Sequence, residues 1–210
     1  MKFLKNYAVV FALVLGTLSS VLSAQAANPV EKLRAACRGI EKEKDALAVE
    51  QAIVVFSEVP QLKAYFENSY GVAVFPTIGK GGLGIGASHG AGWVFREGEL
   101  VGISKVTQLS VGFQWGGQAF RQIIFFEDET AFRHFTSGNY EFGAQASAVA
   151  VTVGVNAQVS TSGGSNAGIG KAQAKTDYTD GVAVFTMEKG GLMYEAAIAG
   201  QKFSFQPLNR

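Results

Sequence analysis

Residues 71–95 read GVAVFPTIGKGGLGIGASHGAGWVF, and this stretch decides the fold of the chain. It begins as a short apolar run, breaks at Pro76, and alternates with a period of two from position 82 onward. The even positions are Gly82, Gly84, Gly86, Ser88, Gly90 and Gly92, and the odd positions are Leu83, Ile85, Ala87, His89, Ala91 and Trp93. Such alternation places the two sets on opposite faces of a β-strand, so we expect the bulky face in the core. Structural glycines on the bare face would permit sharp coiling of the sheet, the close approach of another group, or a narrow polar cavity.

Three helical stretches precede this strand and form an expected helical layer over residues 27–68. The first begins with the capping pair Asn28-Pro29 and repeats apolar residues on one face. The second covers residues 45–56, and the third covers residues 60–68. The expected inward residues are Val30, Leu33, Cys37 and Ile40 in the first stretch and Leu62, Tyr65 and Phe66 in the third. The second stretch carries the apolar residues Leu47, Ile53, Val54 and Phe56. Because the period changes from 3.6 to 2 at Gly71, we place a β-rich core over residues 71–206, within a single domain of residues 27–210.

Later segments extend the predicted sheet. Residues 109–116 and 149–159 alternate like the opening stretch, whereas residues 122–126 form a continuous apolar run, typical of a strand buried on both faces. Residues 128–135 read as a short helix with Phe132 and Phe135 inward, and residues 160–180 as a long mobile loop. The predicted class is α+β, with N-terminal helices packed on a strongly twisted antiparallel sheet that could close into a barrel.

The C-terminal part of the chain repeats the opening stretch. The run GVAVF at residues 71–75 recurs at residues 181–185, and KGGL at residues 80–83 recurs at residues 189–192. Each copy reads as a strand, a lysine-bearing turn and a second strand. We therefore predict two equivalent hairpins in one sheet, with Lys80 and Lys189 at their turns.

Residues 1–26 have the pattern of a secretory signal peptide. Lys2 and Lys5 precede an apolar run over residues 7–22, and Ala24-Gln25-Ala26 provides a small-residue cleavage site. We expect cleavage near Ala26 and a periplasmic or secreted protein that associates peripherally with a membrane.

Charge and cysteine content exclude several classes of function. The whole chain has 18 basic and 17 acidic residues, so cleavage at Ala26 would leave a net charge near −1. Such a chain has no bulk positive field that would recruit nucleic acid or an anionic membrane, so any anion binding must come from a local cluster. Cys37 is the only cysteine, which rules out an internal disulfide and a thiolate metal site, and it is expected to be a small buried helix residue.

Two motifs resemble catalytic or nucleotide-binding sites. Residues 79–84 match GxGxxG, but the dinucleotide site requires a following helix, and the residues that follow alternate as a strand. Residues 86–90 match GxSxG, yet Ser88 lies in that same strand, and the candidate acid and base, Asp128 and His134, are only six residues apart. We expect His134 on a helix surface and His89 satisfied on the apolar face. We predict no enzyme activity, no cofactor and no metal.

Several ordered motifs resemble the SYLF domain family. The motif VFP-x3-KGG lies within residues 71–83, and residues 110–118 are similar to the family's SxGxQxGxQ strand. Further similarities are a strand and "ALxxF" helix over residues 125–135, a GxxASVA-like segment over residues 143–149, and a KGLMAG-like close at residues 189–193. The resemblance covers about residues 45–206, with departures at Phe113 and around Tyr194-Glu195.

This resemblance implies a compact α+β domain that binds lipid head groups. Eukaryotic adaptors of the family bind phosphoinositides, and some, including yeast endocytic adaptors, bind actin. With a signal peptide, the chain is similar to an exported bacterial member, for which an anionic lipid or membrane surface is the expected partner and actin is not.

The expected lipid contacts are basic side chains near glycine-rich turns. Lys80 and Lys189 would contact head-group phosphates as point charges, assisted by glycine amides. A second contact could come from Lys32, Arg34 and Arg38 in the first helix, where a solvated face with ion pairs is the alternative. Two other functions stay open: a structural or protein-partner-binding envelope module, and a small outer-membrane β-barrel, which the N-terminal helices and the buried run at residues 122–126 disfavour.

Overall fold

A computed structural model describes residues 28–81, 85–111, 118–143, 149–150, 178–189, 198 and 200–208 of the protein. Its α-helices are α2 (Pro29–Ala36), α3 (Glu43–Ser57), α4 (Lys63–Asn68) and α5 (Glu129–Phe135), with 3-10 turns at Cys37–Gly39 and Pro60–Leu62. Its strands are β1 (Gly71–Gly81), β2 (Ile85–Arg96), β3 (Glu99–Val111), β4 (Gln118–Phe126), β5 (Tyr140–Glu141), β6 (Val149–Ala150), β7 (Val182–Glu188) and β8 (Lys202–Pro207). The predicted α+β class is confirmed.

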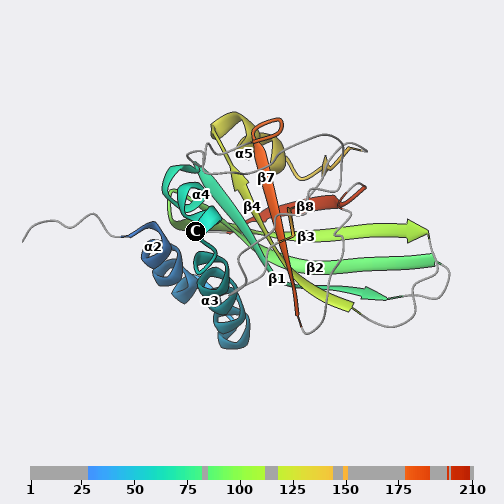
Figure 1. Ribbon diagram of the computed structural model, residues 1–210, viewed down its shortest axis with the longest axis horizontal. Helices are drawn as coiled ribbons and strands as arrows, with labels where there is room; N and C mark the ends of the chain where they lie inside the picture. The colour runs from blue at the N-terminus through green and yellow to red at the C-terminus, as the bar shows by residue number, and fades with distance from the viewer. Residues whose placement is uncertain are drawn as a thin grey trace, which may run out of the picture.

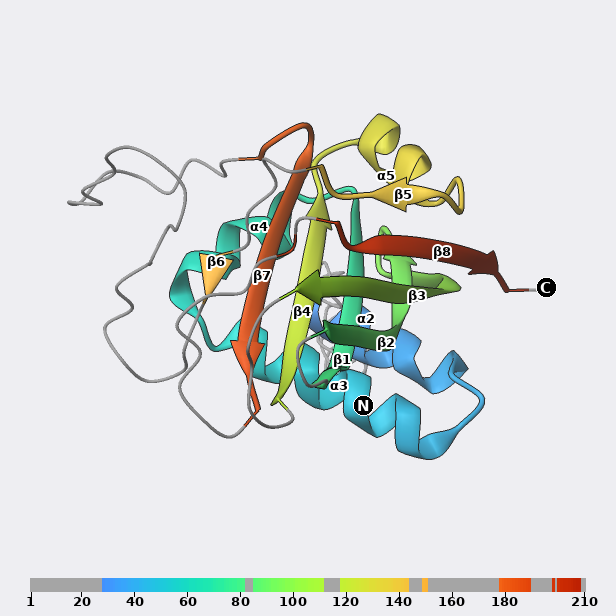
Figure 2. The ribbon, with the colours of Figure 1, turned by 90° about the vertical axis from the view of Figure 1, so that its right-hand side faces the viewer.

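The described strands form one sheet in the order β5-β8-β3-β2-β1-β4-β7-β6, in which each neighbouring pair is antiparallel except β6 and β7. Helices α2 and α3 lie at one side of the sheet, and β1, β2 and β3 extend well beyond them (Figure 1). Figure 2 shows β3 and β8 running nearly horizontally, whereas β4 and β7 run steeply. The sheet is therefore strongly curled, as a half-barrel.

The curled sheet separates two cores. The helix-side core joins α2, α3 and α4 to one face of the sheet, through residues such as Phe56, Val72 and Phe185. The concave core fills the other face with α5 and a group of aromatic rings that includes Phe75 and Phe203. Residues 122–126 of β4 are all buried, which confirms the predicted doubly buried strand.

The helices pack largely as the sequence predicts, but α3 begins at Glu43, two residues before the predicted stretch, and its Leu47 is 59% exposed while Ile53 and Phe56 are buried. The Asn28 side chain accepts a hydrogen bond from the Val30 amide at 3.0 Å, and Asp128 caps α5 in the same way at the Ala131 amide. The predicted inward residues are buried, apart from a half-buried Val30: Leu33, Cys37, Ile40, Leu62, Tyr65, Phe66, Phe132 and Phe135.

Pro76 does not break its strand, which corrects the first expectation. β1 continues from Gly71 to Gly81, and its register shifts by one residue between Val74 and Thr77 relative to β2. A comparable shift against β4 falls between Phe75 and Ile78. The chain accommodates the proline in a β-bulge, because a bulge is a position where a missing N–H costs no ladder hydrogen bond.

The expected orientation of β2 is wrong in its outer half. Ser88 and Gly92 are buried in the concave face, whereas Ala87, His89 and Ala91 are exposed on the other side. A Cβ added at Gly92 would lie 2.5 Å from the Phe75 ring, so the bare face makes room for large side chains of neighbouring strands. Gly86 and Gly90 also lie in β2, while Gly82 and Gly84 are outside the described residues.

The GVAVF repeat does occur within one sheet, since β1 and β7 both flank β4. The two copies are not equivalent, however. Val72 lies opposite Phe125 of β4, and the residue opposite Phe125 on the other side is Ala183, not Val182. This one-residue offset turns each copy's valines toward a different core. The second strand expected after Lys189 falls on residues 190–197, outside the described residues.

Other predictions also fall largely outside the described residues: the signal peptide at residues 1–26, most of the loop at residues 160–180, and the strand at residues 149–159 beyond β6. The search for a bilayer-spanning helix within the described part of the chain found none of sufficient length and hydrophobicity.

Candidate functional site

None of the described helices covers the helix-side face of the sheet at the end where β1, β2 and β4 extend past them (Figure 1). Trp93, Ile123 and Met187 belong to the helix-side core. Ala91, Arg121 and Lys189 lie two residues further toward the free end of β2, β4 and β7, respectively. Because side chains alternate along a strand, these three residues are on the same helix-side face. We call this free area, formed by Thr77, Gly79, His89, Ala91, Ala119, Arg121 and Lys189, the outer patch.

Lys189 lies across the outer patch. Its backbone amide donates to the Ala119 carbonyl at 2.9 Å, which extends the pairing of β7 with β4 by one residue. Its ammonium Nζ donates to Thr77 Oγ1 at 2.8 Å. Because Thr77 is on β1 and β4 lies between β1 and β7, the side chain crosses β4 above Ala119.

Arg121 adds a second cation beside Lys189. Burial lowers the pKa of Lys189, and the nearby positive charge of Arg121 lowers it further. Burial also lowers the pKa of Arg121, whose side chain is half-buried. Neither cation forms an ion pair with a carboxylate among the described side chains. The patch is therefore positively charged and lacks an internal counterion within that set.

The floor of the outer patch is nearly bare backbone. Gly79 pairs with Ala119 on β4 and with His89 on β2. A Cβ added at Gly79 would have no atom within 4 Å, so the space above this residue is open. Two cations and one hydroxyl thus border a shallow surface of small residues.

The two lysines predicted as lipid contacts lie at the same end of the sheet. Lys80 pairs through its backbone with Ser88 and Gln118, whereas Lys189 is level with Ala119 and Gly79. Since β1 and β7 are two strands apart, their backbones are separated by roughly 10 Å. Lys80 is a strand residue, not a turn residue, and its role and that of Lys189 in lipid contact stay predictions.

The basic residues of the first helix lie at the opposite end. Lys32 packs near Gly98 in the β2–β3 turn, far along β2 from His89. Arg34 donates to Glu31 and Glu50 at 2.8 Å each, and these hydrogen bonds raise its pKa. Arg38 is exposed. The structure does not bring these residues next to Lys80 and Lys189, and the alternative of a solvated face with ion pairs describes Arg34.

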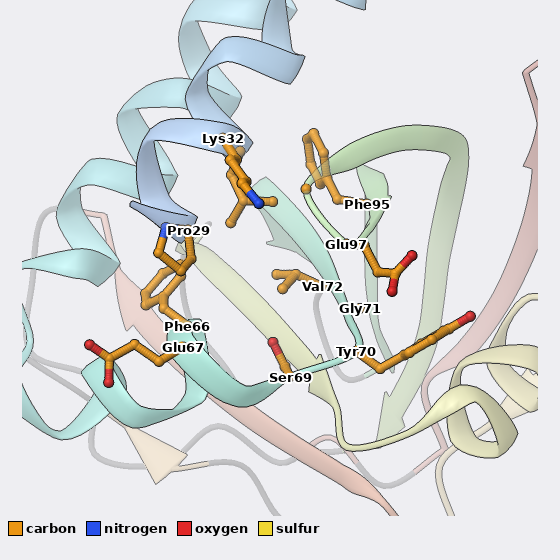
Figure 3. Close-up of a pocket in the computed structure, with 12 residues that line it drawn as sticks. Pro29, Lys32, Phe66, Glu67, Ser69, Tyr70, Gly71, Val72, Phe95 and Glu97 are labelled. Carbon is orange, nitrogen blue, oxygen red and sulfur yellow. The ribbon is translucent and has the colours of Figure 1, made fainter. Parts of the chain in front are cut away.

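A small pocket of about 190 Å³ lies beside α2 (Figure 3). Leu33, Phe66, Val72 and Phe95 are its apolar lining residues, and Lys32, Glu67, Ser69, Tyr70 and Glu97 are its polar ones. A wider groove of about 760 Å³ adjoins it and adds Glu41, Glu99 and Leu100. Among the lining residues of the pocket and the groove, carboxylates outnumber the ammonium group of Lys32. This end of the sheet is therefore poorly suited to binding anions.

Acidic residues gather at that end of the sheet more generally. Gly71 at the start of β1 pairs with Arg96 and Phe126, so the ends of β2 and β4 lie together there. The described acids in the adjoining turns and caps are Glu97, Glu99, Glu127, Asp128, Glu129 and Asp180. Arg96 lies at the same end and Arg133 on α5, so basic residues are interspersed with these acids.

The structure also places the residues of the two motifs that resemble nucleotide-binding and catalytic sites. Strand β2, not a helix, follows residues 79–84, as the alternation predicts. Ser88 is a buried strand residue whose Oγ has no hydrogen-bond partner in the described structure. His134 is exposed on α5 as expected, whereas His89 is exposed and not satisfied in an apolar face. No group of three or more potential metal ligands is present among the described residues.

Sequence reasoning missed Arg121 and Thr77. No motif or periodic pattern in the sequence points to either residue: Arg121 directly precedes the buried run at residues 122–126, and Thr77 directly follows Pro76. Counting outward by two from Ile123 would have placed Arg121 on the helix-side face. Thr77 could not be placed in this way, because the bulge in β1 changes the face of every residue after it.

Residues 107–207 match the family model Ysc84, described as Las17-binding protein actin regulator. A curated relative, Beta cell expansion factor A of Aeromonas veronii, is 28% identical over 152 residues, which cover 72% of this chain and 51% of that protein. The chain thus spans about half the length of this relative. Arg121 and Lys189 lie within the matched family segment, whereas Thr77 and Lys80 precede it.

Proposed function

From the membership in the SYLF family that residues 107–207 establish, we propose that this protein is a non-enzymatic lipid-binding module. The family is one of binding modules associated with lipid and actin. We propose that this chain rests on anionic membrane surfaces through the outer patch, and that it does so outside the cytoplasm, in the periplasm or cell envelope, after cleavage near Ala26.

The observation that carries this proposal is the pair of uncompensated cations at the helix-free end. A basic side chain near an anionic membrane contributes about 1 kcal/mol of attraction. Arg121 and Lys189 would together supply about 2 kcal/mol by the same estimate, enough for weak, reversible peripheral binding.

Vesicle sedimentation tests this proposal. The purified protein is mixed with phosphatidylcholine vesicles, with or without phosphatidylglycerol, at low and high salt. We expect retention only by the anionic vesicles, and weaker retention at high salt because the charges are screened. The double variant Arg121→Ala/Lys189→Ala, which removes both cations of the outer patch, should release the protein.

The matched control is Lys32→Ala/Arg38→Ala, which removes the same charge from the opposite end. This control should bind like the unaltered protein. Equal retention by neutral vesicles, or equal losses in both double variants, would overturn the proposed contact.

A protein partner is the second candidate function, and the groove beside α2 favours it. The groove combines Leu100, Ala36 and Leu208 with the carboxylates of Glu41, Glu97 and Glu99. An apolar lining with an acidic rim suits a basic peptide segment better than a lipid phosphate. Chemical crosslinking in envelope extracts, with Glu97→Lys/Glu99→Lys as the test variant, distinguishes this function from lipid binding, which that change should not weaken.

A further inference from the structure

Thr77, Arg121 and Lys189 bring three hydrogen-bond donors to one face of three adjacent strands. Gln122 pairs with Phe75 and Phe120 pairs with Ile78, so Arg121 faces the bulge of β1 that contains Thr77. Gly79 is opposite Ala119. Lys189 is level with Ala119 and reaches back to Thr77 at 2.8 Å. The donors therefore border a single area, whose floor is the backbone of Gly79 and Ala119.

We propose that this area is a discrete binding site for a phosphate monoester, the terminal phosphate of a lipid head group or of a soluble phosphate ester. The lipid form of this inference rests on the proposed function, and it names the head-group class that the outer patch would select.

The charge of the site favours a dianion. Two cations lie close enough for one to depress the pKa of the other, and the described side chains provide no carboxylate to either. A phosphate monoester carries about −1.5 to −2 charges near neutral pH and presents three free oxygens. A phosphodiester carries one charge and has two free oxygens. The monoester therefore compensates both cations, whereas the diester leaves part of the repulsion in place.

The donor geometry also fits three oxygens. The guanidinium of Arg121 can hold two oxygens through its fork of N–H groups. The ammonium of Lys189 can bind the third as a point charge, since an ammonium has three donors and Thr77 Oγ1 occupies one. The Thr77 hydroxyl, which accepts from Lys189, retains its own proton to donate.

Gly79 provides a way to close the site without changing its charge. A Cβ at this position meets no atom within 4 Å, and the residue has no positive φ. A valine should therefore fit the strand, because β-branched residues suit extended backbone. Its side chain would project over the floor that a phosphate would occupy.

The test compares vesicles of equal surface charge that contain either phosphatidic acid, a monoester, or phosphatidylglycerol, a diester. The unaltered protein should bind phosphatidic acid more tightly. Arg121→Gln should weaken that binding by about tenfold, as expected for the loss of a charge-assisted hydrogen bond. Gly79→Val should abolish the preference for phosphatidic acid, whereas Lys32→Ala/Arg38→Ala, at the opposite end of the sheet, should keep it.

Soluble ligands separate the two sources of the phosphate. Inorganic phosphate and glycerol 3-phosphate should shift the amide resonances of Gly79 and Ala119 in the unaltered protein and not in Arg121→Gln. If the soluble esters bind but vesicles of both kinds fail, the site takes a soluble ligand and the proposed membrane function is wrong. Equal binding of both vesicle types, without shifts from the soluble esters, would refute the site and leave the membrane function standing.

Discussion

Val72 and Val182 occupy the same place in the repeated sequence GVAVF, yet they face opposite sides of the sheet. Val72 packs in the helix-side core, and Val182 packs in the concave core. The cause is the register against β4, because Val72 is opposite Phe125 and Val182 is opposite Phe126. A shift of one residue exchanges the two faces of a strand, so identical sequences here have different structural roles.

This arrangement predicts that Phe75 and Phe185, the aromatic residues that close the two copies, act independently. Phe75 contacts Phe203 in the concave core, whereas Phe185 packs on Tyr65 and Phe125 in the helix-side core. Substitution of each by alanine should cost about 3–5 kcal/mol. The milder changes Phe75→Leu and Phe185→Leu should be additive within about 0.5 kcal/mol in urea unfolding. A clear coupling energy between them would contradict the separation into two cores.

Gly92 of β2 and Gly79 of β1 should differ sharply in their tolerance of substitution by alanine. Gly92→Ala would drive a Cβ into the Phe75 ring, so we expect a loss of about 1–3 kcal/mol in the free energy of unfolding. Gly79→Ala enters open space and should leave stability unchanged or slightly higher. Thermal unfolding of both variants checks this contrast. Adding Phe75→Leu to Gly92→Ala should recover part of the loss, since the smaller side chain can yield.

Three buried glutamines should form one energetic unit inside the curled sheet. Gln122 and Gln201 exchange amide hydrogen bonds at 3.0 and 3.2 Å, and Gln201 also donates to Gln108 at 3.5 Å. Gln201→Leu would leave the Gln122 amide buried without this partner, which costs about 1–3 kcal/mol. The double variant Gln122→Leu/Gln201→Leu should lose less free energy of unfolding than the sum of the losses in the two single variants. A double-mutant cycle by urea unfolding measures the coupling, and strict additivity would contradict it.

Cys37 should make stability fall at alkaline pH. Burial raises the pKa of its thiol from 9.0 to about 11, and its Sγ donates to the Leu33 carbonyl at 3.3 Å. The folded state therefore keeps the proton when the unfolded state has lost it, so the thiol's contribution is complete below pH 9 and is lost as pH rises toward 11. Between pH 9 and pH 11, the urea midpoint of the unaltered protein should fall more steeply with pH than the urea midpoint of Cys37→Ala. Parallel pH profiles would contradict this assignment.

The sequence by itself determined the helices, the buried strand and the class of fold, because these depend on local signals. Caps at Asn28 and Asp128, helical spacing of apolar residues and the apolar run at residues 122–126 need no distant partner to be read. Only the tertiary structure decided which face of β2 is buried. Alternation in the sequence shows that the two faces differ, but it does not show which face will be covered by the larger side chains of neighbouring strands. The same holds for the outer patch. Arg121, Lys189 and Thr77 meet because β1 and β7 both flank β4 and because the bulge at Pro76 turns Thr77 to the free face. Strand order and bulge register are long-range choices that the packing of the two cores makes.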